Sequence, residues 1–245
     1  GRTWSTPIRV APPLEGPEWE LCCPITELAD GRWLLVSSTW PDWEGCLPNG
    51  HQLVAFVSHD RGVSWPECMR VMSEPESEAV IFWESKIVEL LDGRLLAVAW
   101  CHDLPGAVDR PNQFAISADG GASWTRHRST DLIGQTQTPL VIGQDHVLVV
   151  YRRTDEPGLW LQEVQIEGDE WVNRAARPLW GHSAEGATDM GESMSENFRG
   201  LRFGAPSVVR LDDGAVFIVF WCYEDNVSVI RWFRLESTPV VSAVE

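Results

Sequence analysis

The stretch Ser58-His-Asp60-Arg-Gly62-Val-Ser64-Trp65 occurs a second time in this chain, as Ser117-Ala-Asp119-Gly-Gly121-Ala-Ser123-Trp124. Both copies follow the pattern S-x-D-x-G-x-[ST]-W, and the chain opens on Gly1-Arg-Thr3-Trp4, which matches the second half of the pattern. In such a turn the Asp carboxylate can accept hydrogen bonds from backbone N–H groups, while Gly adopts a backbone angle that other residues resist. The tryptophans recur about every 60 residues, a period typical of modular folds whose units are too small to bury a core alone.

A second repeat, a pair of apolar runs joined by an Asp-Gly turn, lies between these turns. It is centred on Asp30-Gly31, Asp92-Gly93 and Asp213-Gly214, and a variant turns at Gly143-Gln-Asp145-His. Asp-Gly between two apolar runs is a strong hairpin signal, and no stretch has helical periodicity. Each unit is therefore predicted to be a four-stranded antiparallel blade, at about 19–71, 80–128, 135–180 and 203–236.

The S-x-D-x-G-x-[ST]-W pattern resembles the Asp box of the sialidase-like, BNR-repeat superfamily. The resemblance covers nearly the whole chain and implies an all-β, six-bladed propeller in one domain, of which about four blades are present here. Because the chain begins inside the pattern, we expect further sequence upstream of Gly1. The localisation is left open, with a secreted or periplasmic protein as the alternatives.

Composition narrows the function classes. The formal net charge is −17, from 36 acidic and 19 basic residues, which argues against nucleic acid as a partner. No apolar run is long enough to span a membrane. The six cysteines have no zinc-ligand spacing, so we predict no metal and no cofactor. Isolated buried thiols are the expected state, with one or two disulfides in a secreted protein as the alternative.

Candidate site positions follow from the hairpin geometry. Residues eight positions before and eight positions after each turn Asp should meet at the end of the hairpin opposite the turn. In a propeller these ends gather on one face near the central channel, where small ligands bind. We therefore expect a single cleft around Glu84, Trp100, Arg153 and Trp221. The predicted facing pairs are Cys22 with Ser38, Glu84 with Trp100, Gln137 with Arg153, and Ala205 with Trp221.

The resemblance also suggests roles. Retaining sialidases use a Tyr nucleophile assisted by Glu, an Asp acid/base and three Arg that bind the substrate carboxylate. The phrase beginning Trp83-Glu84 and ending Asp-Gly-Arg-Leu is similar to the family phrase N-E-x-x-V-V-E-L-x-D-G-x-L, and Glu84 matches its first Glu. The family's Arg position is Trp100 here, and Ala205 stands near the family's Tyr position. The resemblance places the first Arg and the Asp acid upstream of Gly1. The hairpin positions and the resemblance together give the candidate site. Its catalytic candidates are Glu84, Tyr223 and Glu224, and its substrate-binding candidates are Arg153, Arg152, Gln137, Trp100, Trp221 and Arg202.

Several of these residues have a second interpretation. Tyr223 is either a shifted nucleophile or a structural residue, and Trp100 and Trp221 either stack on sugars or pack between blades. His102 with Asp103 is either an acid/base couple or a loop hydrogen bond. The irregular stretch 181–204 either brings Arg199 and Arg202 to an anion clamp or is a solvated linker.

The sequence predicts a sialidase-like glycoside hydrolase acting on terminal, acidic sugars of glycans. The alternative is a non-catalytic carbohydrate-binding propeller, and a third reading is a scaffold for protein partners. In the first two readings the partner is a glycan or a small carbohydrate.

Overall fold

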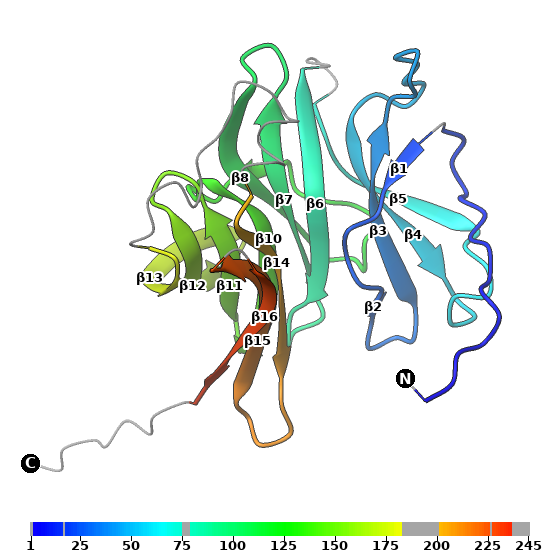
Figure 1. Ribbon diagram of the computed structural model, residues 1–245. Helices are drawn as coiled ribbons and strands as arrows, with labels where there is room; N and C mark the ends of the chain where they lie inside the picture. Colours follow the sequence, from blue (N-terminus) through cyan, green and yellow to red (C-terminus); the bar gives the residue numbers. More distant parts are fainter. Residues whose placement is uncertain (1, 17, 75–78, 183–200, 226, 237–245) are drawn as a thin grey trace, which may run out of the picture. The chain divides into compact units, whose positions relative to one another are not determined.

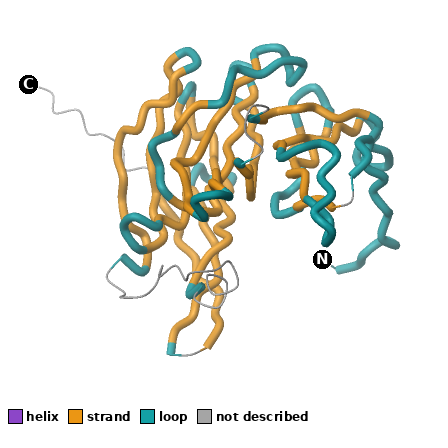
Figure 2. Tube along the Cα trace, turned by 90° about the horizontal axis from the view of Figure 1, so that it is seen from above, coloured by secondary structure: helices purple, strands orange, loops and turns teal. Residues whose placement is uncertain are grey.

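The computed structural model describes residues 2–16, 18–74, 79–182, 201–225 and 227–236. These residues form strands, turns and loops without a helix, as Figures 1 and 2 show. The all-β class predicted from the sequence is confirmed. Within the same ranges no helix is long and apolar enough to span a bilayer.

The strands form four antiparallel sheets, and each sheet is built from strands that are consecutive in the sequence. The first has the order β1-β3-β4-β5 with β2 also on β3, and the second has the order β6-β7-β8-β9. The third has the order β10-β11-β12-β13, and the fourth has the order β14-β15-β16. The strand bounds are β1 Glu18–Glu20, β2 Thr26–Glu27, β3 Trp33–Trp40, β4 Gln52–Ser58, β5 Glu67–Ser73, β6 Val80–Glu89, β7 Leu95–Asp103, β8 Val108–Ser117, β9 Arg128–Ser129, β10 Gly134–Gly143, β11 His146–Arg153, β12 Gly158–Glu167, β13 Glu170–Trp180, β14 Phe203–Arg210, β15 Val216–Glu224 and β16 Val227–Leu235.

The chain divides into two compact units. The N-terminal unit, residues 1–133, contains the first two sheets, and the C-terminal unit, residues 134–245, contains the other two. The grouping of all four sheets into one domain stays a prediction.

The Asp-Gly hairpins have the predicted geometry. In the first, Leu28 N donates to Arg32 O at 2.8 Å, and Gly31 has a φ of 87°. The turns at Gly93 and Gly214 repeat this arrangement, with φ values of 86° and 85°. Glycine reaches this left-handed region without steric cost, so the sequence fixes the turn positions locally.

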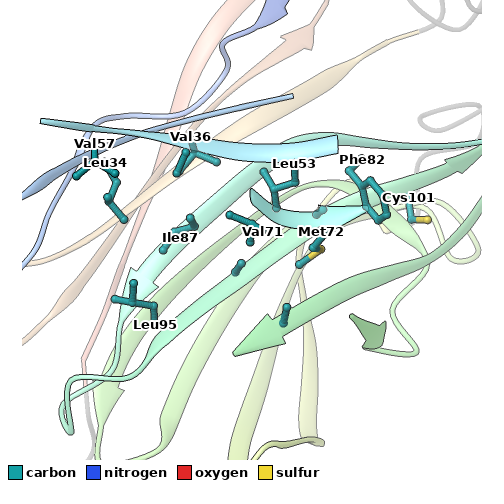
Figure 3. Close-up of a cluster of buried hydrophobic side chains, with 14 of the residues drawn as sticks. Leu34, Val36, Leu53, Val57, Val71, Met72, Phe82, Ile87, Leu95 and Cys101 are labelled. Atoms are coloured by element: carbon teal, nitrogen blue, oxygen red, sulfur yellow. The ribbon is translucent and has the colours of Figure 1, made fainter. Parts of the chain in front are cut away.

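The core of the N-terminal unit lies between its two sheets (Figure 3). Phe82 and Ile87 of β6 pack with residues of the first sheet that include Leu34 and Leu53. Polar contacts join the same sheets, since Thr26 Oγ1 donates to Ile87 O at 2.9 Å. Each large buried apolar side chain contributes about 1.5–3 kcal/mol and a net hydrogen bond about 1 kcal/mol, so apolar burial dominates this interface.

In the C-terminal unit, sheets three and four share a second core. Val150 and Leu159 pack with Phe203, Ile218 and Phe220, all of which are buried. Further contacts to this core come from Trp180, whose ring lies 5.2 Å from that of Phe203. The core explains why the apolar runs on both sides of the third and fourth hairpin turns carry so few charges.

The two S-x-D-x-G-x-S-W turns have matching hydrogen bonds. Asp60 accepts from Ser64 N at 2.8 Å and from Ser64 Oγ at 2.6 Å, while Gly62 N donates to Ser58 Oγ at 2.7 Å. The Ser117–Trp124 turn repeats these bonds at 2.8, 2.5 and 2.8 Å. Trp65 at the end of the first turn is buried with Leu35, Val54 and Phe56 of the first sheet. Both Asp carboxylates thus accept the backbone N–H hydrogen bonds within the turn that the sequence pattern predicts.

These turns predict a pH dependence. Hydrogen bonds from Ser64 and Ser123 lower the pKa of Asp60 and of Asp119 to about 2. A carboxylate whose pKa is lower in the folded than in the unfolded state stabilises the protein at pH values above its unfolded pKa of about 4. This stability is lost as the pH falls from about 4 to about 2.

We expect the double variant Asp60→Asn with Asp119→Asn to be less stable than wild type at neutral pH. That difference should shrink across the acid window in urea unfolding. Asp212→Asn, at an exposed turn, is the matched control, and parallel pH curves for wild type and the double variant would contradict the argument.

The cysteines are all unpaired. Cys101 and Cys222 are buried, as expected for isolated thiols, whereas Cys22 and Cys46 are exposed. The expectation of buried thiols is therefore wrong for those two residues.

Candidate functional site

The first long strands of three sheets, β6, β10 and β14, carry the same irregularity before the run that leads into the hairpin turn. Their register shifts lie between Trp83 and Lys86, between Gln135 and Thr138, and between Gly204 and Ser207. Inside these bulges Glu84, Thr136 and Ala205 have φ values of 47°, 54° and 46°. A non-glycine residue in this region costs of order 1 kcal/mol or more, and such residues cluster at functional sites. The three bulges therefore mark equivalent positions.

The strand register contradicts all four predicted facing pairs. Ser38 faces Glu20 rather than Cys22. Trp100 faces Trp83 rather than Glu84, and Trp221 faces Gly204 rather than Ala205, because the bulge shifts the register by one residue in the second and fourth sheets.

In the third sheet the bulge itself is also displaced from the predicted position. The bulge residue is Thr136 rather than Gln137, and the cross-strand pair is Gln135 with Arg152 rather than Gln137 with Arg153. The cause is the shorter turn, in which Gly143 pairs directly with His146. Counting from Asp145 therefore gives a position one residue too far along β10. Gln137 is fully buried, and its amide atoms have no hydrogen-bond partner among the described residues.

Glu84 is held by a carboxylate from the other sheet of the N-terminal unit. Its backbone N donates to Glu20 Oε1 at 2.9 Å and Oε2 at 3.1 Å. Cys22 Sγ lies 3.2 Å from Glu20 Oε1, and Lys86 Nζ donates to Glu84 O at 3.2 Å. Burial raises the pKa of Glu20, although the Glu84 N–H and the Lys86 charge act in the opposite direction. Glu20 was missed by the sequence reasoning because no local pattern links positions 20 and 84.

Trp100 belongs to a packed aromatic group in the same unit. Its ring centroid lies 4.6 Å from that of Trp83, which also stacks on His102 at 5.1 Å with an interplanar angle of 17°. Trp100 is 5% exposed, and its Nε1 donates to Asp109 Oδ1 at 2.7 Å. The packing interpretation of Trp100 is therefore favoured over an open sugar platform.

His102 has a different acidic partner from the one predicted. Its Nδ1 lies 2.8 Å from Asp109 Oδ1, because β7 and β8 pair His102 directly with Asp109. Asp103 is the next residue along β7, so its side chain points to the other face of the strand, where it contacts Arg110 and accepts from Gly106 N. The predicted His102–Asp103 couple is wrong, and a buried His102–Asp109 pair replaces it.

The two neighbouring arginines of the C-terminal unit differ sharply. Arg152 is buried, and its guanidinium donates to Gln135 Oε1 at 3.0 Å and to Phe203 O at 2.9 Å. It thus links β11 to both β10 and β14. Arg153 instead binds Asp155 at 2.8 and 2.9 Å. Its guanidinium also lies 4.6 Å from the Trp160 ring centroid. The Asp155 carboxylate raises the pKa of Arg153 further.

Tyr223 and Glu224 are not brought together by β15. Consecutive strand residues point to opposite faces, and the two side chains have separate contacts. The Tyr223 ring is 44% exposed and lies edge-on to Trp221 with centroids 5.9 Å apart. Glu224 accepts from Arg231 Nε at 2.9 Å, and this contact lowers the pKa of Glu224. Tyr151, the second tyrosine of the chain, is buried, which raises its pKa to about 12.

Arg202 and Arg199 are the remaining predicted site residues. Arg202 has an exposed side chain, and its carbonyl accepts from Tyr223 N at 2.8 Å. Arg199 lies outside the described residues. Across the described ranges, His, Cys, Asp and Glu side chains form no group of three that could hold a metal ion. Glu84 and Trp100 lie in the N-terminal unit and the other candidates in the C-terminal unit, so their predicted common cleft stays a prediction.

The sheets are those of a β-propeller of the sialidase type, present in part. A protein of unknown function from Dyadobacter fermentans DSM 18053 is similar with a TM-score of 0.61 and 22% identity, over 84% of this chain and 50% of that chain. The NanB sialidase from Streptococcus pneumoniae is similar with a TM-score of 0.58 and 17% identity, over 89% and 31%. The GH43B protein of the Bacteroides ovatus xyloglucan PUL has a TM-score of 0.52 and 13% identity, over 93% and 40%. This chain thus spans half the length of the first of these structures and about a third of the second.

The BNR repeat-like domain family matches residues 1–226. The chain belongs to this family. No curated protein sequence matches it with significance.

Proposed function

We propose that the protein is a sialidase-like glycoside hydrolase acting on terminal sugars of glycans, with Glu84 as the base or nucleophile-assisting carboxylate. The single observation that carries the proposal is the left-handed backbone of Glu84, which Glu20 holds in the half of β6 away from the hairpin turn, where the sequence predicts a ligand site. Its equivalents in sheets three and four are Thr136 and Ala205, so only this copy of the bulge carries a carboxylate. Family membership and the similarity to a sialidase fold support the proposal.

The contacts of the arginines bear on whether the terminal sugar is acidic. A substrate carboxylate needs arginines that are available to form a clamp. Arg153 is already paired with Asp155 and Glu156, and Arg152 is buried against Gln135. Neutral terminal sugars therefore belong in any test beside sialosides.

A non-catalytic carbohydrate-binding propeller is the second candidate. It is favoured by one observation, the separation of Tyr223 from Glu224, which leaves Tyr223 without the neighbouring carboxylate that a shifted nucleophile on β15 would use. Trp221 and Tyr223 would then serve as an aromatic surface for sugar rings.

The test is turnover by the full-length protein of a panel of chromogenic glycosides, with sialosides and neutral sugars side by side, together with glycan binding. Release of the leaving group from any member would support hydrolysis. Binding to glycans without turnover would decide for the second candidate, and neither binding nor turnover would overturn both.

A further inference from the structure

The Glu20 carboxylate joins the two sheets of the N-terminal unit through a backbone N–H. Both of its oxygens lie within 3.1 Å of a single donor, the backbone N of Glu84. Glu20 belongs to β1, where it pairs with Ser38 of β3, and Glu84 belongs to β6. The carboxylate thus bridges the first and second sheets at the position of the bulge.

Glu20 bonds to the backbone of a residue whose conformation is strained. Glu84 has a φ of 47°, and such a conformation persists only where the surroundings determine it. Two contacts do so here, because Glu20 accepts from the N–H of Glu84 and Lys86 donates to its carbonyl. A hydrogen bond to a charged acceptor is roughly twice as strong as a neutral one. The backbone orientation fixes in turn the direction in which the Glu84 side chain leaves the strand.

We propose that Glu20 is a positioning residue, whose carboxylate locks the left-handed backbone of Glu84 and thereby aims the Glu84 side chain. The effect on backbone conformation stands on the contacts alone, whereas the effect on turnover rests on the proposed function. Glu20 acts through Glu84 and not on the substrate.

The groups around Glu20 determine how its hydrogen bond with the Glu84 N–H, here called the lock, responds to pH. The groups that face the Glu20 carboxylate are Cys22 in the loop after β1, Ser38 of β3, and Glu84 and Lys86 of β6. The ionised carboxylate is the better acceptor for the Glu84 N–H. The lock should therefore be strongest at neutral pH and weaken as the pH falls toward 4.5, the ordinary value from which burial raises the pKa of Glu20.

The experiment measures amide hydrogen exchange by NMR on the full chain, corrected for intrinsic rates, for wild type, Glu20→Ala and Glu20→Gln. In Glu20→Ala the Glu84 amide should exchange about 10-fold faster or more, the ratio expected for loss of a hydrogen bond to a charged group. In wild type the Glu84 protection should fall on acidification, and in Glu20→Gln, which keeps an uncharged acceptor, it should be independent of pH.

A matched control exists in the same unit. Ala29 N donates to Glu89 Oε2 at 2.7 Å, a second carboxylate–amide contact between these sheets, at the hairpin-turn end of β6. Glu89→Ala should speed exchange at Ala29 and leave Glu84 unchanged. Unchanged exchange at Glu84 in Glu20→Ala, or the same loss in Glu89→Ala, would overturn the proposal.

The turnover assay adds the functional readout. With a substrate that the full chain hydrolyses, Glu20→Gln and Glu20→Ala should lower kcat by about 10-fold and about 100-fold with little change in KM, because misplacing a catalytic group acts on the chemical step. Glu89→Ala should retain wild-type kcat. An unchanged kcat in Glu20→Ala despite faster Glu84 exchange would overturn the role in turnover. Absence of turnover in wild type would count against the proposed function only. The exchange measurement tests the hydrogen bond between Glu20 and Glu84 independently of activity.

Discussion

Glu84→Gln in the full-length protein is expected to lower kcat by about 10²-fold or more, the contribution typical of a positioned acid or base. The substitution keeps the size of the side chain and removes only its ability to carry charge or accept a proton. Glu84 makes its contact with Glu20 through the backbone N, which the substitution leaves in place. The free energy of unfolding should therefore change by less than about 0.5 kcal/mol.

The measurement pairs single-turnover kinetics on an active chromogenic glycoside with urea unfolding of the same preparations. Glu89→Gln is the control, because it removes a charge from the same strand at the end near the hairpin turn. Full activity in Glu84→Gln would show that this carboxylate takes no part in the chemistry. Equal losses in both variants would assign the effect to the net charge or to the strand.

The hairpins and the S-x-D-x-G-x-S-W turns were predictable because their determinants are local. Gly31, Gly93 and Gly214 adopt the left-handed conformation that the Asp-Gly pattern predicts. The Asp60 and Asp119 carboxylates find their donors four residues away along the chain. A pattern that contains both partners of an interaction needs no knowledge of the tertiary structure.

The site was predicted less well, since it depends on register and on distant partners. Counting eight residues back from the turn Asp reached the bulge residue Glu84 but missed Thr136, because the turn at Asp145 has a different length. It gave the wrong partner for Trp100 and for Trp221, because each bulge shifts the register by one residue. Strand alternation alone could have separated Tyr223 from Glu224.

No pattern in the sequence predicts two of the contacts at the site. Glu20 reaches Glu84 across two sheets, and Asp109 reaches His102 across a strand pair. In both contacts the tertiary structure selects one acid from the 36 acidic residues of the chain.

Arg152→Ala is expected to lower the free energy of unfolding of the C-terminal unit by about 3 kcal/mol, the cost of removing a buried, hydrogen-bonded charge that its partners require. The substitution deletes the donors to Gln135 Oε1 and Phe203 O, and so the side-chain link from β11 to β14. The fit of the guanidinium against β14 depends on Gly204, where a Cβ would lie 2.7 Å from Arg152 Nη1.

Arg153→Ala gives the contrasting result and completes the test. Arg153 is the adjacent residue, with the same charge, but its partners Asp155 and Glu156 are near the surface, where an ion pair contributes about 0.2–1 kcal/mol. Urea unfolding of both variants, followed by the fluorescence of the tryptophans, measures the difference. If Arg152 bound substrate instead, Arg152→Ala would raise KM and leave the unfolding midpoint near that of Arg153→Ala. A large loss of stability with Arg152→Ala alone would assign Arg152 to the packing of sheets three and four, and would leave any carboxylate recognition to other residues.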